Sequence, residues 1–202
     1  FDAVGHDDLV ERKGVPVAVG HVERFNPALV AARRYLSTPL YLDADRIGPF
    51  TFRSLDIGVV LDLMIHDLDI LLDLITAPVG RVEAVGVPVL TRHEDIANAR
   101  IRFRNGCVAN VTASRISAKR MRKIRIFSPE AYVSIDSQAR EVMLYRKGEK
   151  FDEAVANLDK IDVSKIKDLT QFLFGGKIIK IEKLRHDEYE PLQREIESFV
   201  VA

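Results

Sequence analysis

The segment from Leu61 to Ile75 (LDLMIHDLDILLDLI) constrains the fold more than any other part of the chain. Its residues are mostly apolar, but four ionisable residues recur at i, i+4, i+7 and i+11. These four are Asp62, His66, Asp69 and Asp73. On a helix with about 3.6 residues per turn they form one narrow stripe, whereas a surface helix normally carries an apolar stripe on a polar cylinder. The sequence therefore predicts a helix built for burial that keeps one ionisable edge, as an acid–base site inside a fold requires.

The ionisable edge has more than one explanation. Asp62 and His66 lie four residues apart, so their side chains can meet on a helix, and a carboxylate there fixes the imidazole tautomer and favours the imidazolium. Because histidine has an ordinary pKa of about 6.5, the pair suits general acid–base catalysis. Periodicity alone equally allows a solvent-facing stripe whose acids interact with the helix dipole. A metal site is a third interpretation, but no HExxH or paired-cysteine spacing supports it.

Composition narrows the class of protein. The 30 basic and 30 acidic residues balance, so the chain has no field that would recruit nucleic acid or an anionic membrane. The only cysteine, Cys107, excludes an internal disulfide and indicates a reducing compartment. No apolar run approaches the roughly 18 residues of a membrane helix, and the start of the chain does not resemble a signal peptide. We therefore expect a cytoplasmic protein.

Short patterns predict the other elements. The apolar run at residues 15–21 is typical of a buried strand. Asn26 and Pro27 suit the N-cap and first position of a helix that reaches about Tyr35, and Asp56 can cap the striped helix. Further strands are predicted at residues 40–47, 81–90, 96–104, 107–116, 123–127, 132–136, 142–145 and 177–182, and a last helix from residue 190. One sheet covered by one helical layer, an α+β fold, follows from this order.

A hairpin is predicted at Asn105 and Gly106, a strong signal for a two-residue turn. A turn of that length places Ile101, Phe103 and Val108 on one face of the hairpin. The opposite face then combines Arg100, Arg102, Arg104, Cys107, Ala109, Val111 and Ala113. Such a mixture of arginines and small residues can meet another subunit or only solvent.

Two basic segments are candidate ligand contacts. Arg24-Phe25-Asn26-Pro27 lies where a predicted strand leads into a helix, a place where ligands bind in α/β folds, and Arg24 suits an anionic group. A helix cap beside an ordinary surface arginine explains the same residues. Residues 115–125 hold six basic side chains in eleven, which fits one solvated strand face or a phosphate contact to a small ligand. Nucleic acid is not expected, because aromatic residues and a net positive charge are missing.

Four segments together resemble the glucose–fructose oxidoreductase/inositol dehydrogenase (Gfo/Idh/MocA) family. They are GHVERFNPA (20–28), VVLDLMIHDLDILLDL (59–74), ASRISAKRMRKIRIF (113–127) and EPLQREIESFV (190–200). The Asp-x-x-x-His-x-x-Asp helix is the most specific of them. The resemblance implies an N-terminal Rossmann domain followed by an α+β domain with an open, mainly antiparallel sheet and helices on one face.

On this resemblance, residues 1–20 are the tail of the dinucleotide-binding domain and residues 21–202 a truncated substrate-binding and oligomerisation domain. The missing initiator Met and the amphipathic pattern still running at Ala202 also favour a fragment. NAD or NADP would be bound mainly by the absent N-terminal domain. The implied partners are a small sugar or nucleotide-sugar substrate and a second copy of the chain, in a dimer or tetramer formed through the sheet face. No metal is implied.

The resemblance also assigns roles to side chains. His66 would exchange the proton of a substrate hydroxyl while hydride passes to or from nicotinamide C4. Asp62 would orient His66 or bind a neighbouring hydroxyl, and Arg24 and Asn26 would lie where substrate and cofactor meet. The other implied substrate contacts are Arg46, Asp69 and Arg115, Pro27 joins Arg24 at the cofactor, and Asp73 is left as plain surface.

One departure from the family lies just before the striped helix. Many members have a Gly-Gly pair where this chain reads Ser54-Leu55-Asp56-Ile57-Gly58, so the local ligand geometry differs. The sequences of these motifs most resemble members that act on nucleotide sugars. The sequence therefore favours part of an NAD(P)-dependent sugar or nucleotide-sugar dehydrogenase. The alternative is a domain of the same fold kept for binding or assembly without catalysis.

Overall fold

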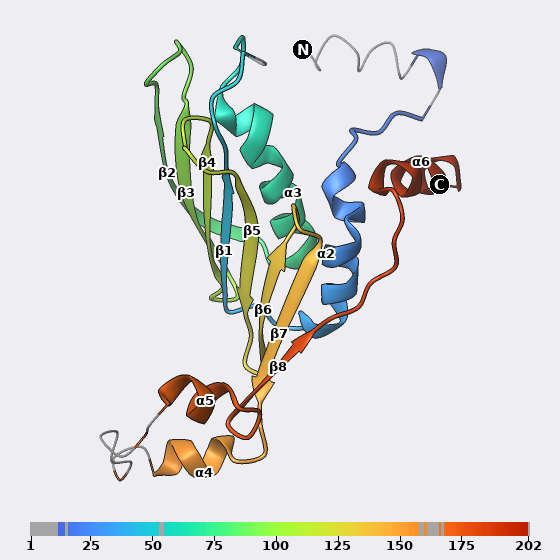
Figure 1. The fold of residues 1–202 in the computed structure, drawn as a ribbon. Helices are drawn as coiled ribbons and strands as arrows, with labels where there is room; N and C mark the ends of the chain where they lie inside the picture. The colour runs from blue at the N-terminus through green and yellow to red at the C-terminus, as the bar shows by residue number, and fades with distance from the viewer. Residues whose placement is uncertain are drawn as a thin grey trace.

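An eight-stranded sheet dominates the computed structural model, which describes residues 12–14, 16–52, 55–157, 160, 166 and 168–201 (Figure 1). The strand order is β2-β3-β4-β1-β5-β6-β7-β8. All neighbours pair antiparallel except β1 and β4, which run parallel. The strands are β1 (Tyr41–Ile47), β2 (Val79–Val87), β3 (Ile96–Phe103), β4 (Val108–Ser114), β5 (Met121–Phe127), β6 (Ala131–Asp136), β7 (Glu141–Lys147) and β8 (Ile179–Lys183). The predicted α+β fold with an open, mainly antiparallel sheet is confirmed.

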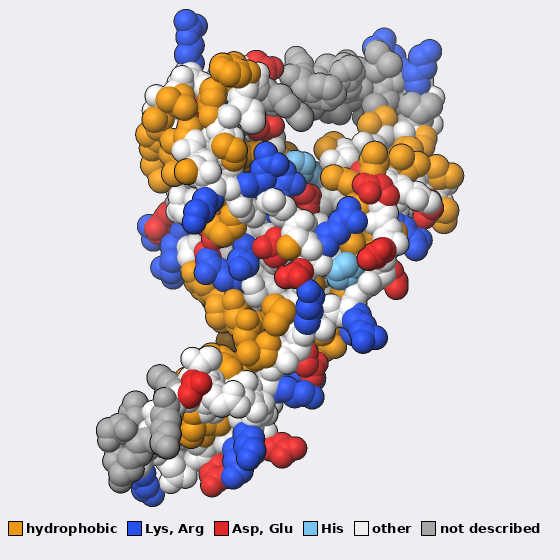
Figure 2. All heavy atoms as spheres, in the orientation of Figure 1, with side chains coloured by type: hydrophobic (Ala, Val, Ile, Leu, Met, Phe, Trp, Pro, Cys, Tyr) orange, Lys and Arg blue, Asp and Glu red, His pale blue; other side chains and the backbone are white. Residues whose placement is uncertain are grey.

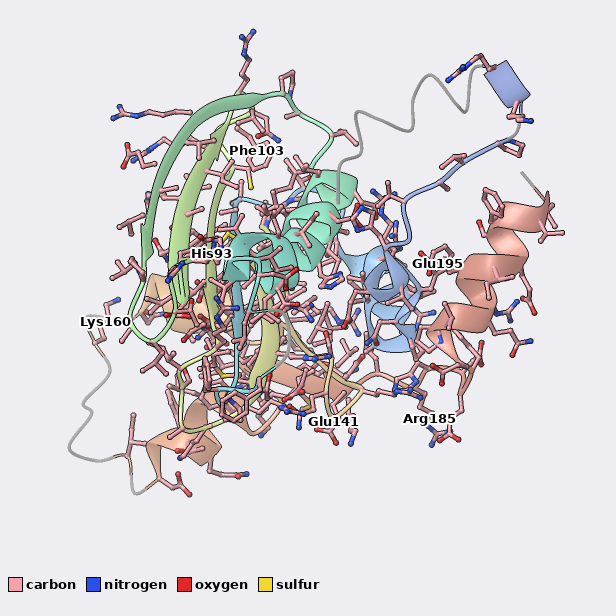
Figure 3. The ribbon with its side chains drawn as sticks, turned by 90° about the horizontal axis from the view of Figure 1, so that it is seen from above. His93, Phe103, Glu141, Lys160, Arg185 and Glu195 are labelled. Carbon is pink, nitrogen blue, oxygen red and sulfur yellow. The ribbon has the colours of Figure 1, made fainter. Side chains whose placement is uncertain are left out.

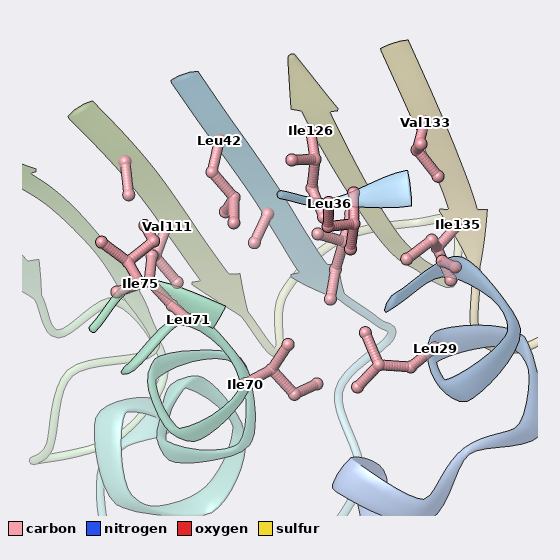
Figure 4. Packing of buried hydrophobic residues seen from close by; sticks show 14 of the residues in the cluster. Leu29, Leu36, Leu42, Ile70, Leu71, Ile75, Val111, Ile126, Val133 and Ile135 are labelled. Carbon is pink, nitrogen blue, oxygen red and sulfur yellow. The ribbon is translucent and has the colours of Figure 1, made fainter. Parts of the chain in front are cut away.

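Helices cover one face of this sheet (Figure 1). The layer consists of η1 (Val22–Phe25), α2 (Pro27–Ala32), η2 (Arg33–Tyr35), the π-helical segment η3 (Val60–Met64) and α3 (Ile65–Leu74). Leu29 of α2 and Ile70 and Leu71 of α3 are buried in one cluster with the strand residues Val111 and Ile126 (Figure 4). Burying one such side chain stabilises the fold by roughly 1.5–3 kcal/mol. This packing fixes the helices on the sheet.

Alternation along the strands explains which side chains of the sheet reach the core. In β1, Leu42, Ala44 and Arg46 are buried and the residues between them are half-buried. In β6, Val133 and Ile135 are buried in the same way. Successive side chains of a strand point to opposite faces, so the period of two decides which residues reach the core. Arg46 is thereby a charged residue at a core position, where it needs a counter-charge.

The striped helix begins with a different cap from the one predicted. The helical residues start at Val60, and Asp56 lies in a turn before them. Glu94 of the β2–β3 connection satisfies the free N–H groups, because its backbone oxygen accepts from Val59 at 3.0 Å and its carboxylate from Val60 at 3.3 Å. A Cβ at Gly58 would lie 1.8 Å from the Glu94 carboxylate, so a larger residue there would push this cap aside. The Asp56 prediction is wrong because a residue distant in sequence takes the capping role.

The strand predicted before the first helix is also absent from the described residues. Residues 16–21 form no strand, and Val17 and Val19 are 65% and 77% exposed. A strand needs a neighbour to satisfy its backbone groups, and no described strand lies beside this segment. The last helix, α6 (Pro191–Val201), lies next to it instead, with Glu195 turned toward Gly20 (Figure 3).

The β3–β4 hairpin has a three-residue loop rather than the predicted two. Phe103 N donates to Cys107 O at 2.9 Å, and Gly106 between them adopts φ of 89°, which favours glycine. The extra residue pairs Ile101 with Ala109, so each side chain of the returning strand lies on the face opposite to the predicted one. The buried face comprises Ala97, Ala99, Ile101, Phe103, Cys107, Ala109, Val111 and Ala113. The arginines of β3 share the other face with polar residues of β4.

Two short helices, α4 (Phe151–Ala156) and α5 (Leu169–Phe174), lie together at one end of the sheet. They stand apart from the main body beyond β7 and β8 (Figures 1 and 2). None of their described residues belongs to the hydrophobic core cluster, so the core forms without them. In the described ranges, no helix has both the length and the apolar character needed to cross a bilayer.

A buried ion pair anchors the β2–β3 connection to the end of β4. One carboxylate oxygen of the fully buried Asp95 accepts from the backbone N–H groups of Val89, Leu90 and Thr91 at 2.8, 2.6 and 2.8 Å. Arg115 Nε donates to the other oxygen at 2.7 Å. Burial raises the pKa of Asp95, but these hydrogen bonds together lower it by more, so the pKa lies well below its ordinary value. Asp95 therefore stays ionised and holds Arg115 in place.

Removing the Asp95 charge should destabilise the fold. In Asp95→Asn the buried Arg115 loses its counter-charge, so we expect the free energy of unfolding to fall by about 3–5 kcal/mol. Glu141→Gln breaks an exposed ion pair with Lys183 and is the matched control, with an expected loss below about 1 kcal/mol. Urea unfolding followed by circular dichroism measures both changes. Equal losses in the two variants would contradict the anchoring role.

Candidate active site

A cavity of about 450 Å³ opens where β1 and β4 end and β5 begins. Asp62 and His66 from η3 and α3 form one side of it. Arg46, Arg115, Arg120 and Arg122 line it from the strands and their ends. Because β1 and β4 are parallel, their carboxyl ends meet at this edge, the position where open sheets bind ligands. The structure thus brings together four of the side chains singled out in the sequence.

His66 is half-buried in the wall of this cavity. Burial lowers its pKa, and the positive charge of Arg46 lowers it further. The carboxylates of Glu23 and Asp67 oppose this and His21 adds a smaller decrease, so the net pKa lies below the ordinary value. The ring Nδ1 is buried and bonded to no described residue, which leaves Nε2 as the nitrogen open to the cavity. At neutral pH the ring is therefore neutral and able to accept a proton.

The predicted contact between Asp62 and His66 is not formed. No hydrogen bond joins the two side chains in the part of the chain that the structure describes, and Asp62 is not among the main influences on the pKa of His66. The reason lies in η3, because a π-helical segment has a wider turn than an α-helix and displaces Asp62 from the i, i+4 position. Burial and Arg46 make the net pKa of His66 lower than its ordinary value, and the role of Asp62 beside it stays a prediction.

Arg46 is the centre of an ion-pair network behind His66. It is only 3% exposed, and its Nε and Nη2 donate to the Asp67 carboxylate at 2.8 and 2.9 Å. Its Nη1 donates to Oε1 of Glu23 at 3.2 Å. Burial alone would lower the pKa of Arg46, but the two carboxylates together raise it by more, so the net pKa is raised. The network joins strand β1 to α3 and η1 and keeps a fixed positive charge beside His66.

Two further cations at the cavity are held less tightly. Arg122 lies 3.5 Å from the Glu23 carboxylate, and its side chain is 42% exposed. Arg120 is exposed and pairs with no described acid. Guanidinium groups with free donors bind carboxylates and phosphates in a planar, two-point manner. This side of the cavity therefore suits the anionic part of a ligand.

Arg24 and Asp69, both predicted substrate contacts, bind each other and do not line the cavity. Nε and Nη2 of Arg24 donate to the two Asp69 oxygens, each at 2.6 Å. His21 Nε2 lies 3.7 Å from the same carboxylate. Asp73 pairs with Arg33, so it is not the plain surface residue that the sequence predicted. The second half of the stripe fastens η1 and the end of α2 to α3.

The other predicted site residues have structural partners. Oδ1 of Asn26 accepts from Ala28 N at 3.1 Å and Pro27 begins α2, as predicted for the helix start, but neither residue lines the cavity. Arg115 does line it, although its guanidinium is committed to Asp95. Across the described residues, no three His, Cys, Asp or Glu side chains are grouped to hold a metal ion.

Comparison with known proteins places this geometry in a family. Residues 35–134 match the GFO/IDH/MocA C-terminal domain. The chain belongs to the GFO/IDH/MocA family. It is 40% identical over 141 residues to the UDP-N-acetylglucosamine 3-dehydrogenase of Acidithiobacillus ferrooxidans, an alignment that covers 69% of this chain and 45% of that protein.

Two solved structures show the same fold. UDP-N-acetylglucosamine 3-dehydrogenase from Acidithiobacillus ferrooxidans superposes with a TM-score of 0.76 at 32% identity, over 98% of this chain and 56% of that one. Levoglucosan dehydrogenase in complex with NADH and levoglucosan superposes with a TM-score of 0.67 at 17% identity, over 96% and 57%. The chain therefore spans about half the length of the relatives it matches.

Three residues of the site in this GFO/IDH/MocA domain were not identified from the sequence. Glu23 and Arg122 line the cavity, and Asp67 holds Arg46 behind it. Glu23 stands directly before Arg24, and the sequence pattern favoured Arg24 as the ligand contact of that segment. Asp67 lies off the ionisable stripe, on a side of the helix that otherwise reads as apolar, and an acid at such a position needs a buried cation. Arg122 was counted only as part of the basic run at residues 115–125. The sequence signal for this ion pair was an acid on an apolar helix face together with an arginine at a core position of a strand.

The imidazole of His66 should titrate below its ordinary pKa of about 6.5. Because burial and Arg46 lower the pKa of His66 in the folded state, the unfolded chain binds the proton more readily. The free energy of unfolding should therefore decrease as the pH falls from about 6.5 toward the folded-state pKa. NMR of the histidine ring signals against pH measures the value, with His66→Gln used to assign the signal. A titration above about 6.5 would contradict the electrostatics described for this site.

Proposed function

We propose that this chain is the substrate-binding part of an NAD(P)-dependent oxidoreductase that transfers a hydride between nicotinamide and a hydroxyl carbon of a sugar or nucleotide sugar. The observation that carries the proposal is a neutral histidine, His66, in a cavity that also presents arginines. The relatives support the same chemistry, since one is a UDP-N-acetylglucosamine 3-dehydrogenase and another was solved with NADH and levoglucosan.

His66 is suited to the proton step of this reaction. When an alcohol is oxidised to a ketone, the hydroxyl loses a proton and the same carbon loses a hydride. In the proposed reaction Nε2 of His66 accepts the proton, and the O–H electron pair forms the C=O bond as the hydride leaves. The nicotinamide would supply only the hydride acceptor, its C4 atom. A neutral ring is the form that oxidation requires, and the protonated ring returns the proton in reduction.

The arginines divide into two kinds for substrate binding. Arg46 has its donors committed to Asp67 and Glu23, so it shapes the electrostatic field around His66. Arg120 and Arg122 have donors to spare and match the charge of a diphosphate. This division favours a nucleotide sugar over a neutral sugar as the substrate.

The described residues fit only the nicotinamide end of the cofactor. His21 Nδ1 is buried without a partner in the described structure, beside the Arg24–Asp69 pair. No glycine-rich turn leads into a helix at the cavity in the described ranges, so we propose that the part of the parent protein outside this chain holds the dinucleotide phosphates. Of the two predicted cofactor contacts, Arg24 is partly exposed but bound to Asp69 through two donors, and Pro27 is buried.

The alternative function is a binding or oligomerisation domain without catalysis. Both functions would use the same cavity and fold, but only the oxidoreductase would turn over a substrate. The expected cytoplasmic location and the homo-oligomer through the sheet face stay predictions. Cys107 is buried and free.

His66→Ala in the full-length parent protein should lower turnover by roughly 10²–10⁴-fold, because the proton acceptor is removed. The assay follows reduced cofactor absorbance with UDP-sugars and free polyols as candidate substrates. His93→Ala, at an exposed histidine of the β2–β3 connection, is the matched control and should keep near-normal turnover. Near-normal turnover in His66→Ala would rule out its role, and a wild-type parent without any turnover would favour the non-catalytic alternative.

Arg122→Ala in the parent protein should raise the KM for a UDP-sugar by about tenfold, because a charged hydrogen bond to the diphosphate is lost. Turnover of a free sugar, if the parent accepts one, should not change. Lys183→Ala removes a cation of β8 outside the cavity and serves as the control. An unchanged KM in Arg122→Ala would contradict the diphosphate contact.

A further inference from the structure

Two buried polar atoms beside the cavity have no hydrogen-bond partner among the described residues. They are Nδ1 of His66 and Oε2 of Glu23. Buried polar groups in folded proteins are almost always paired, so an unpaired one needs an explanation. A ring N–H is a donor and a carboxylate oxygen is an acceptor, so these two atoms are complementary.

The two side chains are close enough to interact. Glu23 on η1 and His66 on α3 line the same cavity, and η1 packs against α3. The Glu23 charge is one of the influences on the pKa of His66, which it raises. Asp62 lines the cavity too but is not among the main influences on this pKa.

Two other titratable groups near His66 have partners of their own. Asp67, on the same helix, is bound through both oxygens by Arg46 of β1. His21, before η1, lies beside Asp69 through its Nε2, and its Nδ1 is buried without a partner among the described residues. Of the two carboxylates, Glu23 is therefore the one with an oxygen to spare.

One carboxylate oxygen of Glu23 is bound by arginines, which sets the direction of the other. Oε1 accepts from Arg46 at 3.2 Å and lies 3.5 Å from Arg122. With Oε1 held on the arginine side, Oε2 is the oxygen left for another donor.

We propose that Glu23 is the positioning residue of His66, with its Oε2 accepting a hydrogen bond from Nδ1–H of the imidazole. This contact fixes the tautomer in which Nε2 carries no proton and faces the cavity. Its catalytic consequence rests on the proposed function, because Nε2 is the atom that would take the substrate proton. The role expected of Asp62 thereby passes to a residue far from it in sequence.

NMR of the 202-residue chain with ¹⁵N-labelled histidine tests the contact without any assay of activity. Long-range ¹H–¹⁵N spectra distinguish the two neutral tautomers, and we expect His66 to carry its proton on Nδ1. Glu23→Met removes the acceptor at similar size and should lose this preference. Asp62→Asn, at the other carboxylate of the cavity, is the matched control and should keep it.

Three results would overturn the proposal. One is a wild-type His66 protonated on Nε2. The second is a His66 tautomer that stays the same in Glu23→Met. The third is a His66 tautomer that changes in Asp62→Asn but not in Glu23→Met. Glu23→Gln covers the case in which Glu23→Met does not fold, because the amide oxygen still accepts while the charge is gone. In that variant the tautomer should persist and the pKa of His66 should fall, since the carboxylate that raised it is lost.

In the parent protein, Glu23→Gln should lower kcat by at least about tenfold with a smaller effect on KM. The acid limb of the pH profile for alcohol oxidation should move to lower pH together with the pKa of His66. An unchanged kcat and pH profile would overturn the positioning role. The NMR result stands whether or not the parent turns over, so a failure of the proposed function is distinguishable from a failure of the Glu23 contact.

Discussion

The bidentate ion pair between Arg46 and Asp67 joins the sheet to the helical layer at the point where the cavity forms. Both side chains are 3% exposed, so each charge depends on the other, and losing one partner of such a pair typically costs about 3–5 kcal/mol. The pair fixes more than the packing. Asp67 follows His66 directly in the chain, so holding Asp67 against β1 also sets where the imidazole lies. The same guanidinium keeps a positive charge next to that ring and lowers its pKa.

The ionisable stripe of the central helix is divided by this arrangement. Its second half, Asp69 and Asp73, binds Arg24 and Arg33 and fastens the neighbouring helical segments. Its first half faces the cavity, where η3 departs from regular α-helical geometry. Irregular helical turns are frequent at functional sites because they redirect individual side chains. One sequence pattern therefore serves two purposes, attachment at one end and chemistry at the other.

Features that depend on neighbouring residues were predictable from the sequence. The Asn26–Pro27 helix start and the alternation of β1 follow from local rules, and the structure has both. Features that depend on distant partners were not. The Glu94 cap comes from a segment beyond the helix it caps, and the three-residue hairpin loop moved one strand's side chains to the other face.

The same division applies to the candidate site. His66 was visible because a lone imidazole stood on an apolar helix with a family-like spacing. Glu23 was not, because its relation to His66 exists only after η1 has folded onto α3. The π-helical segment misled the i, i+4 argument, since that argument assumes a regular α-helix throughout. Sequence periodicity thus located the reacting group, whereas its supporting groups required the tertiary structure.

The pairing of β1 with β4 has a consequence for how such a site diversifies. It is the only parallel pair in the sheet of the described residues, and it places the segments that follow Ile47 and Ser114 side by side at the cavity. These segments can change in length or composition without disturbing any strand register. New ligand preferences can therefore arise by loop exchange on an unchanged scaffold, while Arg46, one position inside the strand, preserves the environment of His66.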